Sequence, residues 1–192
     1  MKDYQHKIIT IPNIISMFRV VLIPFIIYSF VKLNNIPLTV VLIAVSALSD
    51  ILDGKIARKF NMVSDFGKFF DPVADKATQI ALAICLAFKI KMMIPLLIFL
   101  LIKEIFMGVS GYIVIKRTGA PDQAKWYGKA CTVVLYGSMM AMILFPGMPE
   151  WLSFSLICLC AVFMLISIIG YAVLRRREIK ESTTKNNGTE GL

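Results

Sequence analysis

Apolar residues along this chain fall into six long runs that are separated by short polar stretches. A helix that crosses the hydrocarbon core of a bilayer needs about 20 consecutive, mostly apolar residues, and each run approaches that length. Turn-forming residues mark the breaks: Asn34 and Asn35 precede Pro37, and a Pro-Gly-Met-Pro turn at residues 146–149 separates the last two runs. The pattern therefore predicts an all-α fold with six transmembrane helices, over residues 11–32, 37–58, 69–88, 92–116, 127–146 and 150–174.

Composition supports an integral membrane protein. Of the 192 residues, 58% are hydrophobic and 17% are charged, whereas an ordinary soluble domain has about 25% charged residues. The length suits a single domain. The formal net charge of +9 could suggest a nucleic-acid partner, but the basic residues lie at the ends of apolar runs. That placement indicates anionic lipid head groups instead, and we expect a lipid bilayer and no nucleic acid as partner.

The basic residues also predict how the chain is oriented. They gather in alternate gaps, whereas the other gaps hold only Lys32, Lys89 and Lys91. Cytoplasmic loops carry the excess of lysine and arginine, so we expect a multi-pass cell-membrane protein with both termini in the cytoplasm. The basic gaps contain Lys2, Lys7, Lys55, Arg58, Lys59, Lys68, Lys116, Arg117, Lys125, Lys129, Arg175, Arg176, Arg177 and Lys180.

Three segments follow from this pattern. Residues 1–10 mix charged and apolar residues, and could form a short interfacial helix or a frayed terminus. Residues 11–177 form the six-helix domain. Residues 178–192 are polar and contain glycine, so we expect a disordered cytoplasmic tail.

Four aspartates are the main candidates for chemistry. Asp50 and Asp53 are three residues apart, and Asp71 and Asp75 are four apart, so on helices the carboxylates of each pair share one face. Carboxylates at membrane depth are rare and mark a functional site by default. Four converging anions repel one another unless cations neutralise them, and hard oxygen ligands select magnesium, manganese or calcium. Two such ions held close together would clamp a diphosphate and stabilise a phosphoryl displacement.

Residues beside the aspartates suit a phosphate-bearing ligand. Gly54, Ala57 and Gly67 leave room for a bulky group near the backbone, although small residues also allow close helix packing. Arg58 lies where a guanidinium can reach phosphate oxygens, with snorkelling to the lipid surface as the alternative. Further along the chain, Lys103 and Glu104 interrupt an apolar run. We expect this pair to face a cavity, although a structural ion pair would also explain it.

The aspartate segment matches the pattern D-x2-D-G-x2-A-R-x8-G-x3-D-x3-D at every fixed position. It thereby resembles the CDP-alcohol phosphatidyltransferase family, and the residues 11–16 with Phe18 and Arg19 look like that family's first helix. The resemblance implies six helices around a polar cavity that opens to the cytoplasm, a homodimer, and two Mg²⁺ or Mn²⁺ ions on the aspartates. It also implies that Asp75 is the general base. The residues that would bind the CDP-diacylglycerol donor are Asn13, Ser16, Asp53, Gly54, Ala57, Arg58, Ser64 and Gly67.

The acceptor is less constrained by the sequence. The Asp-Pro-Val-Ala-Asp-Lys stretch at residues 71–76 most resembles phosphatidylglycerophosphate synthases, which use glycerol 3-phosphate, with cardiolipin synthases close behind. Those enzymes usually carry an arginine before the acidic residue of the fourth helix, where this chain has Lys103. Lys125 is a further cationic candidate, and Lys129 looks like part of the family's Gly-Lys-x-x-Thr stretch. We expect these two residues, with Lys103 and Glu104, to bind the acceptor.

Three alternatives remain open at the level of sequence. The acceptor could be phosphatidylglycerol, which would give cardiolipin, or another alcohol such as an inositol phosphate. A cation transporter could also use the aspartates to bind ions in transit. Transporters usually show internal repeats or broken helices at the midplane, and we see neither in this sequence. The transport hypothesis also leaves Gly54, Ala57 and Arg58 without a role.

Overall fold

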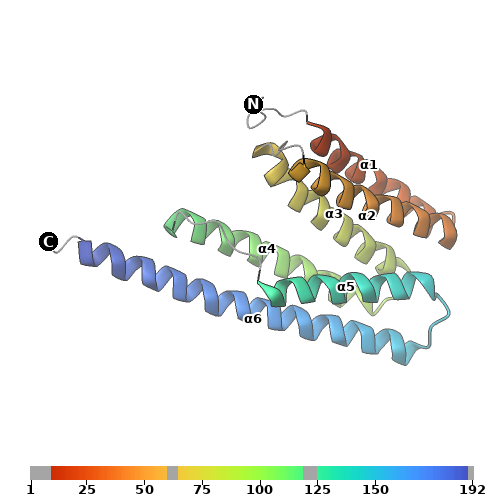
Figure 1. The fold of residues 1–192 in the computed structure, drawn as a ribbon. Coiled ribbons are helices and arrows are strands. Elements are labelled where there is room, and N and C mark those ends of the chain that lie inside the picture. Colours follow the sequence, from red (N-terminus) through yellow and green to blue (C-terminus); the bar gives the residue numbers. More distant parts are fainter. Residues whose placement is uncertain (1–9, 60–64, 119–124, 190–192) are drawn as a thin grey trace. The chain divides into compact units, whose positions relative to one another are not determined.

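The structure is a computed structural model that describes residues 10–59, 65–118 and 125–189 (Figure 1). Every regular element in these three ranges is an α-helix, which confirms the predicted all-α class. The helix positions follow the apolar runs closely at most ends. The helices are α1 (Ile11–Val31), α2 (Ile36–Lys59), α3 (Asp65–Lys89), α4 (Met93–Thr118), α5 (Trp126–Leu144) and α6 (Glu150–Thr189).

Five of these helices are long and apolar enough to cross a membrane. The exception is α3, because its first half carries Lys68, Asp71, Asp75 and Lys76 and is too polar by composition. A helix of its 25 residues is about 37 Å long, which would still span a bilayer. If α3 is the predicted sixth span, neighbouring helices must shield its polar first half from lipid. The five apolar stretches are Asn13–Val31, Ile36–Ile56, Met93–Lys116, Trp126–Leu144 and Glu150–Arg176.

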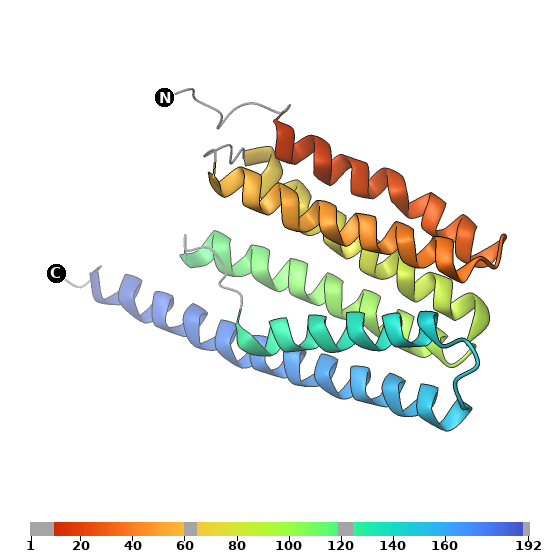
Figure 2. The ribbon, with the colours of Figure 1, turned by 45° about the vertical axis from the view of Figure 1, so that its right-hand side comes forward.

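The helices group into two compact units. In the first, α1 packs against both α2 and α3, and Figures 1 and 2 show these three helices running side by side with alternating direction. In the second, α4 packs against α6. The rings of Tyr127 on α5 and Tyr171 on α6 meet edge to face at 4.9 Å between centroids, so α5 also contacts α6 in that unit.

A short polar turn joins α1 to α2. Asn34 has a φ of 51°, a left-handed conformation that asparagine tolerates better than most residues. The Asn35 side-chain oxygen accepts a hydrogen bond from the Leu38 amide at 3.0 Å and so caps the start of α2. Lys89, at the end of α3, donates to the Asn34 side chain and lies 4.3 Å from the centroid of the Phe30 ring. These contacts fasten the ends of α1, α2 and α3 opposite to the aspartates.

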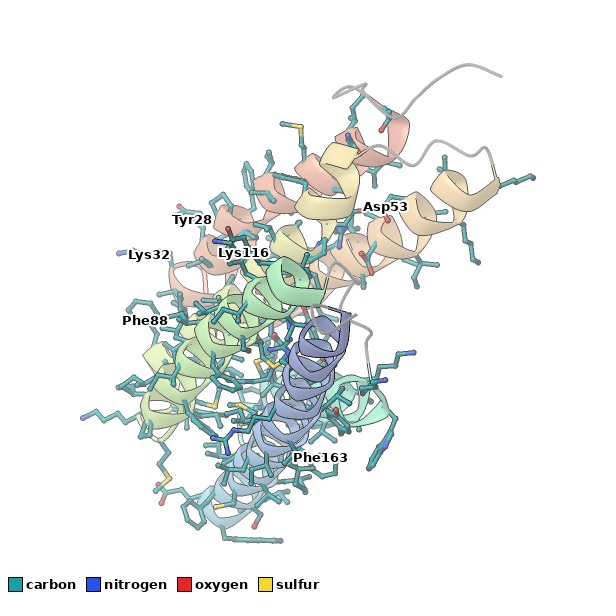
Figure 3. The ribbon with its side chains drawn as sticks, turned by 90° about the vertical axis from the view of Figure 1, so that its left-hand side faces the viewer. Tyr28, Lys32, Asp53, Phe88, Lys116 and Phe163 are labelled. Atoms are coloured by element: carbon teal, nitrogen blue, oxygen red, sulfur yellow. The ribbon has the colours of Figure 1, made fainter. Side chains whose placement is uncertain are left out.

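Burial is inverted relative to a soluble protein. Tyr28 and Phe88, labelled in Figure 3, are 57% and 68% exposed, whereas Ser16 and Arg19 are fully or almost fully buried. Large apolar side chains on the outside and polar ones inside are stable in lipid and unstable in water. The first unit therefore exposes large apolar side chains and buries several polar ones beside its apolar core.

Separate predictions were made for the first ten residues and for the C-terminal tail. The predicted interfacial segment, residues 1–10, lies outside the described residues except for Thr10, whose side chain caps the N-terminus of α1. At the other end, α6 continues to Thr189, within the segment predicted as a disordered tail, whose disorder stays a prediction. Residues 178–189 contain two glutamates and two lysines, which favour helix. This stretch contains no proline, and its first glycine is Gly188.

Candidate active site

The two predicted aspartate pairs lie at one end of the first unit. Asp50 and Asp53 are in the last three turns of α2, and Asp71 and Asp75 are in the first three turns of α3. Since α1 runs antiparallel to α2 and parallel to α3, the beginning of α1 lies at the same end (Figure 1). Three segments that are far apart in sequence therefore meet there.

Ser16 on α1 connects the two acidic helices. Its Oγ lies 2.9 Å from Oδ2 of Asp53 and 2.6 Å from Oδ1 of Asp71, and its side chain is fully buried. A hydroxyl has one proton to donate, so it can serve only one of these carboxylates at a time as a donor. The contact brings one oxygen of each acidic pair together and leaves more acceptors than donors.

Arg19, one turn after Ser16, bridges the two aspartates of α2. Its Nη2 donates to Oδ2 of Asp53 at 3.0 Å, and its Nη1 forms an ion pair with Oδ1 of Asp50. The Arg19 side chain is 3% exposed, as against 5% for Asp53 and 53% for Asp50. Asp53, labelled in Figure 3, thus lies in the interior beside α1, and Asp50 lies at the rim.

The donor chemistry of this cluster fits a divalent cation. Asp50, Asp53, Asp71 and Asp75 offer only carboxylate oxygens, the ligands that Mg²⁺ and Mn²⁺ prefer, and Arg19 offsets one of the four negative charges. Within the described part of the chain, no three acidic, histidine or cysteine side chains are grouped closely enough to hold a metal ion.

The predicted donor-binding residues divide by burial. Asn13 and Ser16 are buried on α1, Gly67 is buried on α3 and Gly54 is half-buried on α2. Asn13 lies one turn before Ser16, so the two side chains share one face of α1. Ala57 and Arg58 belong to α2, but their side chains are outside the described residues, as is all of Ser64.

The predicted acceptor residues lie in the second unit. Nζ of Lys103 is 2.7 Å from Oε1 of Glu104, and Lys103 is only 5% exposed. The ion pair that the sequence left as one alternative is therefore present, and a role in acceptor binding stays a prediction. Lys125, just before α5, is half-buried, and its backbone amide donates to the Tyr171 hydroxyl at 3.1 Å. Lys129, in the first turn of α5, is exposed.

Two buried arginines were not predicted as site residues. Arg19 was recognised only as part of the first helix, and Arg175 only as a topology signal. Arg175 is 4% exposed, donates from Nη1 to the Met107 carbonyl at 3.1 Å and to the Ser110 hydroxyl, and lies 5.0 Å from the centroid of the Tyr171 ring. For Arg19 the signal was available, since it is the one charged residue within residues 11–31. A charge in a membrane helix usually faces the protein interior.

Comparison with known proteins identifies the class. The sequence model of the CDP-alcohol phosphatidyltransferase family matches residues 9–173. The chain belongs to this family, which confirms the resemblance carried by the aspartate motif. The match covers α1 to α5 in full and α6 as far as residue 173.

Three individual relatives carry names that specify an activity within this family. A protein of Aquifex aeolicus named CDP-diacylglycerol–glycerol-3-phosphate 3-phosphatidyltransferase is 37% identical over 134 residues, which cover 69% of this chain and 74% of the relative. A Streptomyces coelicolor protein named cardiolipin synthase (CMP-forming) is 29% identical over 146 residues, covering 73% of this chain and 68% of the relative. A protein of Rickettsia felis with the same name as the Aquifex protein is 33% identical over 114 residues, covering 58% and 63%. Both kinds of relative expected from the sequence are therefore present.

Proposed function

We propose that this protein transfers the phosphatidyl group of CDP-diacylglycerol to glycerol 3-phosphate, giving phosphatidylglycerol phosphate and CMP. The convergence of Asp53 and Asp71 on the buried Ser16 hydroxyl carries the proposal. It brings the two halves of the family's acidic motif together at one end of the helices. The choice of acceptor draws on the names of the Aquifex and Rickettsia relatives.

The reaction is a displacement at the β-phosphorus of the donor. The acceptor hydroxyl attacks this phosphorus, a new ester bond forms, and the bond to the bridging oxygen breaks so that CMP leaves. Two divalent cations on Asp50, Asp53, Asp71 and Asp75 would offset the charge of the diphosphate when bound. Asp75, half-buried on α3, takes the proton of the acceptor hydroxyl as general base.

The α1 and α2 residues hold the donor and the carboxylates in place. Ser16 contacts Asp53 and Asp71, and Arg19 pairs with Asp50 and Asp53, so the carboxylates are held near one another before metal and donor bind. Gly54 and Gly67 give the diphosphate access to the backbone, and Asn13, Ala57, Arg58 and Ser64 complete the donor site. The burial of Asn13, Ser16 and Asp53 in the first unit supports this assignment.

The membrane arrangement that goes with this function has six spans, with α3 included, and a polar cavity open to the cytoplasm. The basic residues at alternate gaps support the cytoplasmic orientation of both termini. The donor has a water-soluble nucleotide and an apolar diacylglycerol, which suit a site at the boundary between cytoplasm and membrane. A homodimer is part of the proposal and rests on the family resemblance.

For the acceptor, the second unit offers buried positive charge. Lys103, paired with Glu104, lies in the apolar α4, and Arg175 adds a second buried cation that Tyr171 and Ser110 position. Buried cations on rigid helices suit the phosphate of glycerol 3-phosphate. Lys125 and Lys129, at the start of α5, would extend the same binding region.

A second candidate, cardiolipin synthesis from phosphatidylglycerol, is favoured by one observation. The residue before Glu104 is Lys103, where the resemblance to phosphatidylglycerophosphate synthases leads one to expect arginine. A lysine keeps the charge but lacks the two-pronged fork that suits a phosphate monoester. The Streptomyces relative is named for this activity.

Product analysis distinguishes the two acceptors. Purified protein with Mg²⁺ and CDP-diacylglycerol is offered glycerol 3-phosphate or phosphatidylglycerol, and the lipid product is identified by mass spectrometry. The proposal expects phosphatidylglycerol phosphate from the first acceptor and no cardiolipin from the second. Cardiolipin as the sole product would make the second candidate correct.

Replacement of Lys103 tests where the acceptor binds. We expect Lys103→Ala to raise the KM for glycerol 3-phosphate by about tenfold or more, because a charged hydrogen bond to phosphate contributes about 1.5–3 kcal/mol. The KM for CDP-diacylglycerol should change much less. Steady-state kinetics with each substrate varied in turn gives both values, and Lys116→Ala, an exposed lysine at the end of α4, is the matched control. An unchanged acceptor KM would return Lys103 to a purely structural role.

A further inference from the structure

Arg19 stands in an unusual position for a residue beside metal ligands. Its guanidinium is almost fully buried and contacts Asp53 and Asp50 through different nitrogens. Its Nε has no hydrogen-bond partner among the described residues. The arginine is therefore held by the two carboxylates rather than by a full set of hydrogen bonds.

Arg19 and Ser16 both contact the same oxygen of Asp53. Oδ2 of Asp53 receives Nη2 of Arg19 at 3.0 Å and the Ser16 hydroxyl at 2.9 Å. The Ser16 hydroxyl has one proton and can turn it to Asp71, whereas the Arg19 N–H group has no other role than donation and occupies a lone pair of the Asp53 oxygen. A metal ion on this oxygen therefore competes with Arg19.

Charge repulsion indicates that a cation on Asp53 would displace Arg19 rather than Ser16. A guanidinium and a divalent cation on the same carboxylate repel each other, and the repulsion is strong where water is largely excluded. Ser16 is neutral and raises no such conflict. Without a cation, by contrast, the buried Asp53 needs the positive charge, since an uncompensated buried carboxylate is strongly destabilising.

We propose that Arg19 is the resident counter-ion of the carboxylate cluster and gives up Asp53 when a divalent cation binds, so that it lowers the affinity of the site for metal. This inference rests on the proposed role of the aspartates as metal ligands. Arg19 keeps the acidic helices packed when no metal is bound, and its competition limits how tightly the metal is retained. It acts through the carboxylates and is a positioning residue.

The test measures Mn²⁺ binding to purified protein in detergent, without lipid substrates, from the electron paramagnetic resonance signal of free Mn²⁺. Arg19→Gln removes the charge but keeps a polar side chain. We expect it to lower the Kd for Mn²⁺ by about tenfold or more, the effect of removing one nearby like charge. Arg176→Gln, which removes an exposed arginine from α6, is the matched control for net charge and should leave the Kd unchanged.

Thermal unfolding provides an independent readout. Without metal, Arg19→Gln should unfold at a lower temperature than the wild type, and saturating Mn²⁺ should close the gap. Arg19→Lys keeps the charge but cannot reach Asp50 and Asp53 together, so its Kd should lie between those of the wild type and Arg19→Gln. The lysine variant maintains the test if the glutamine variant does not fold.

The outcomes separate this inference from the proposed function. If the wild type binds Mn²⁺ and the Arg19 variants bind it equally well or more weakly, Arg19 supports the ligands rather than competing for them, and the inference is wrong. If neither the wild type nor the variants bind Mn²⁺, the aspartates are not metal ligands, and the proposed metal site falls together with the inference.

Discussion

Replacing Asp75 by asparagine is expected to lower kcat by about a thousandfold, in the middle of the range for loss of a general base. Asparagine has nearly the same shape as aspartate but cannot accept the proton of the acceptor hydroxyl. CDP-diacylglycerol should still bind with much of its wild-type affinity, because the proposed donor contacts on α1 and α2 are unchanged. Turnover is measured as CMP release, and donor affinity is measured by equilibrium binding of radiolabelled CDP-diacylglycerol.

Metal titration separates the two proposed roles of Asp75. If Asp75 were only a metal ligand, raising the Mn²⁺ concentration would restore turnover in Asp75→Asn by mass action. The lost base cannot be replaced in this way, so we expect kcat to stay low at saturating Mn²⁺. Activity near that of the wild type at any metal concentration would remove the general-base assignment.

Asp53→Ala is expected to have the largest effect on stability. It leaves the buried Arg19 guanidinium with only Asp50, which is 53% exposed, and it removes one of the two carboxylates on Ser16. Breaking a buried pair by removing one partner costs about 3–5 kcal/mol. The midpoint of thermal unfolding in detergent without metal should fall accordingly, and CMP release should be lost.

Asp50→Ala is the matched comparison, since it removes the other partner of the same arginine. Exposed ion pairs contribute about 0–1 kcal/mol, and Arg19 keeps its contact with the buried Asp53. We therefore expect a much smaller loss of stability than for Asp53→Ala, although both variants lose a proposed metal ligand. Equal destabilisation by the two variants would show that burial does not decide the strength of these contacts.

The sequence predicted the positions of the helices well, because most helices end where a long apolar run ends. It was less accurate where a helix is polar. The predicted third helix started at residue 69, whereas α3 starts at Asp65, and the last was expected to end near residue 174, whereas α6 reaches Thr189. Hydropathy reports burial in lipid and gives no signal for a polar turn that continues a helix.

The candidate site was predictable in its residue types and only partly in its contacts. Spacing showed that Asp50 and Asp53 share a helix face, but it does not fix the rotation of α2 relative to α1 and α3. That rotation decides that Ser16 contacts Asp53 and Asp71, and that Arg19 contacts Asp50 and Asp53. Such contacts arise from packing between distant segments, which one sequence does not reveal.

The most direct test of the central claim is metal-dependent release of CMP from CDP-diacylglycerol by the purified protein, with glycerol 3-phosphate present. The account predicts release with Mg²⁺ or Mn²⁺, none after chelation with EDTA, and recovery when the metal is restored. The Asp71→Asn variant should show no release under the same conditions. Release that is unaffected by EDTA, or the absence of any release together with uptake of divalent cations into proteoliposomes, would contradict the account. Uptake would favour the transport hypothesis.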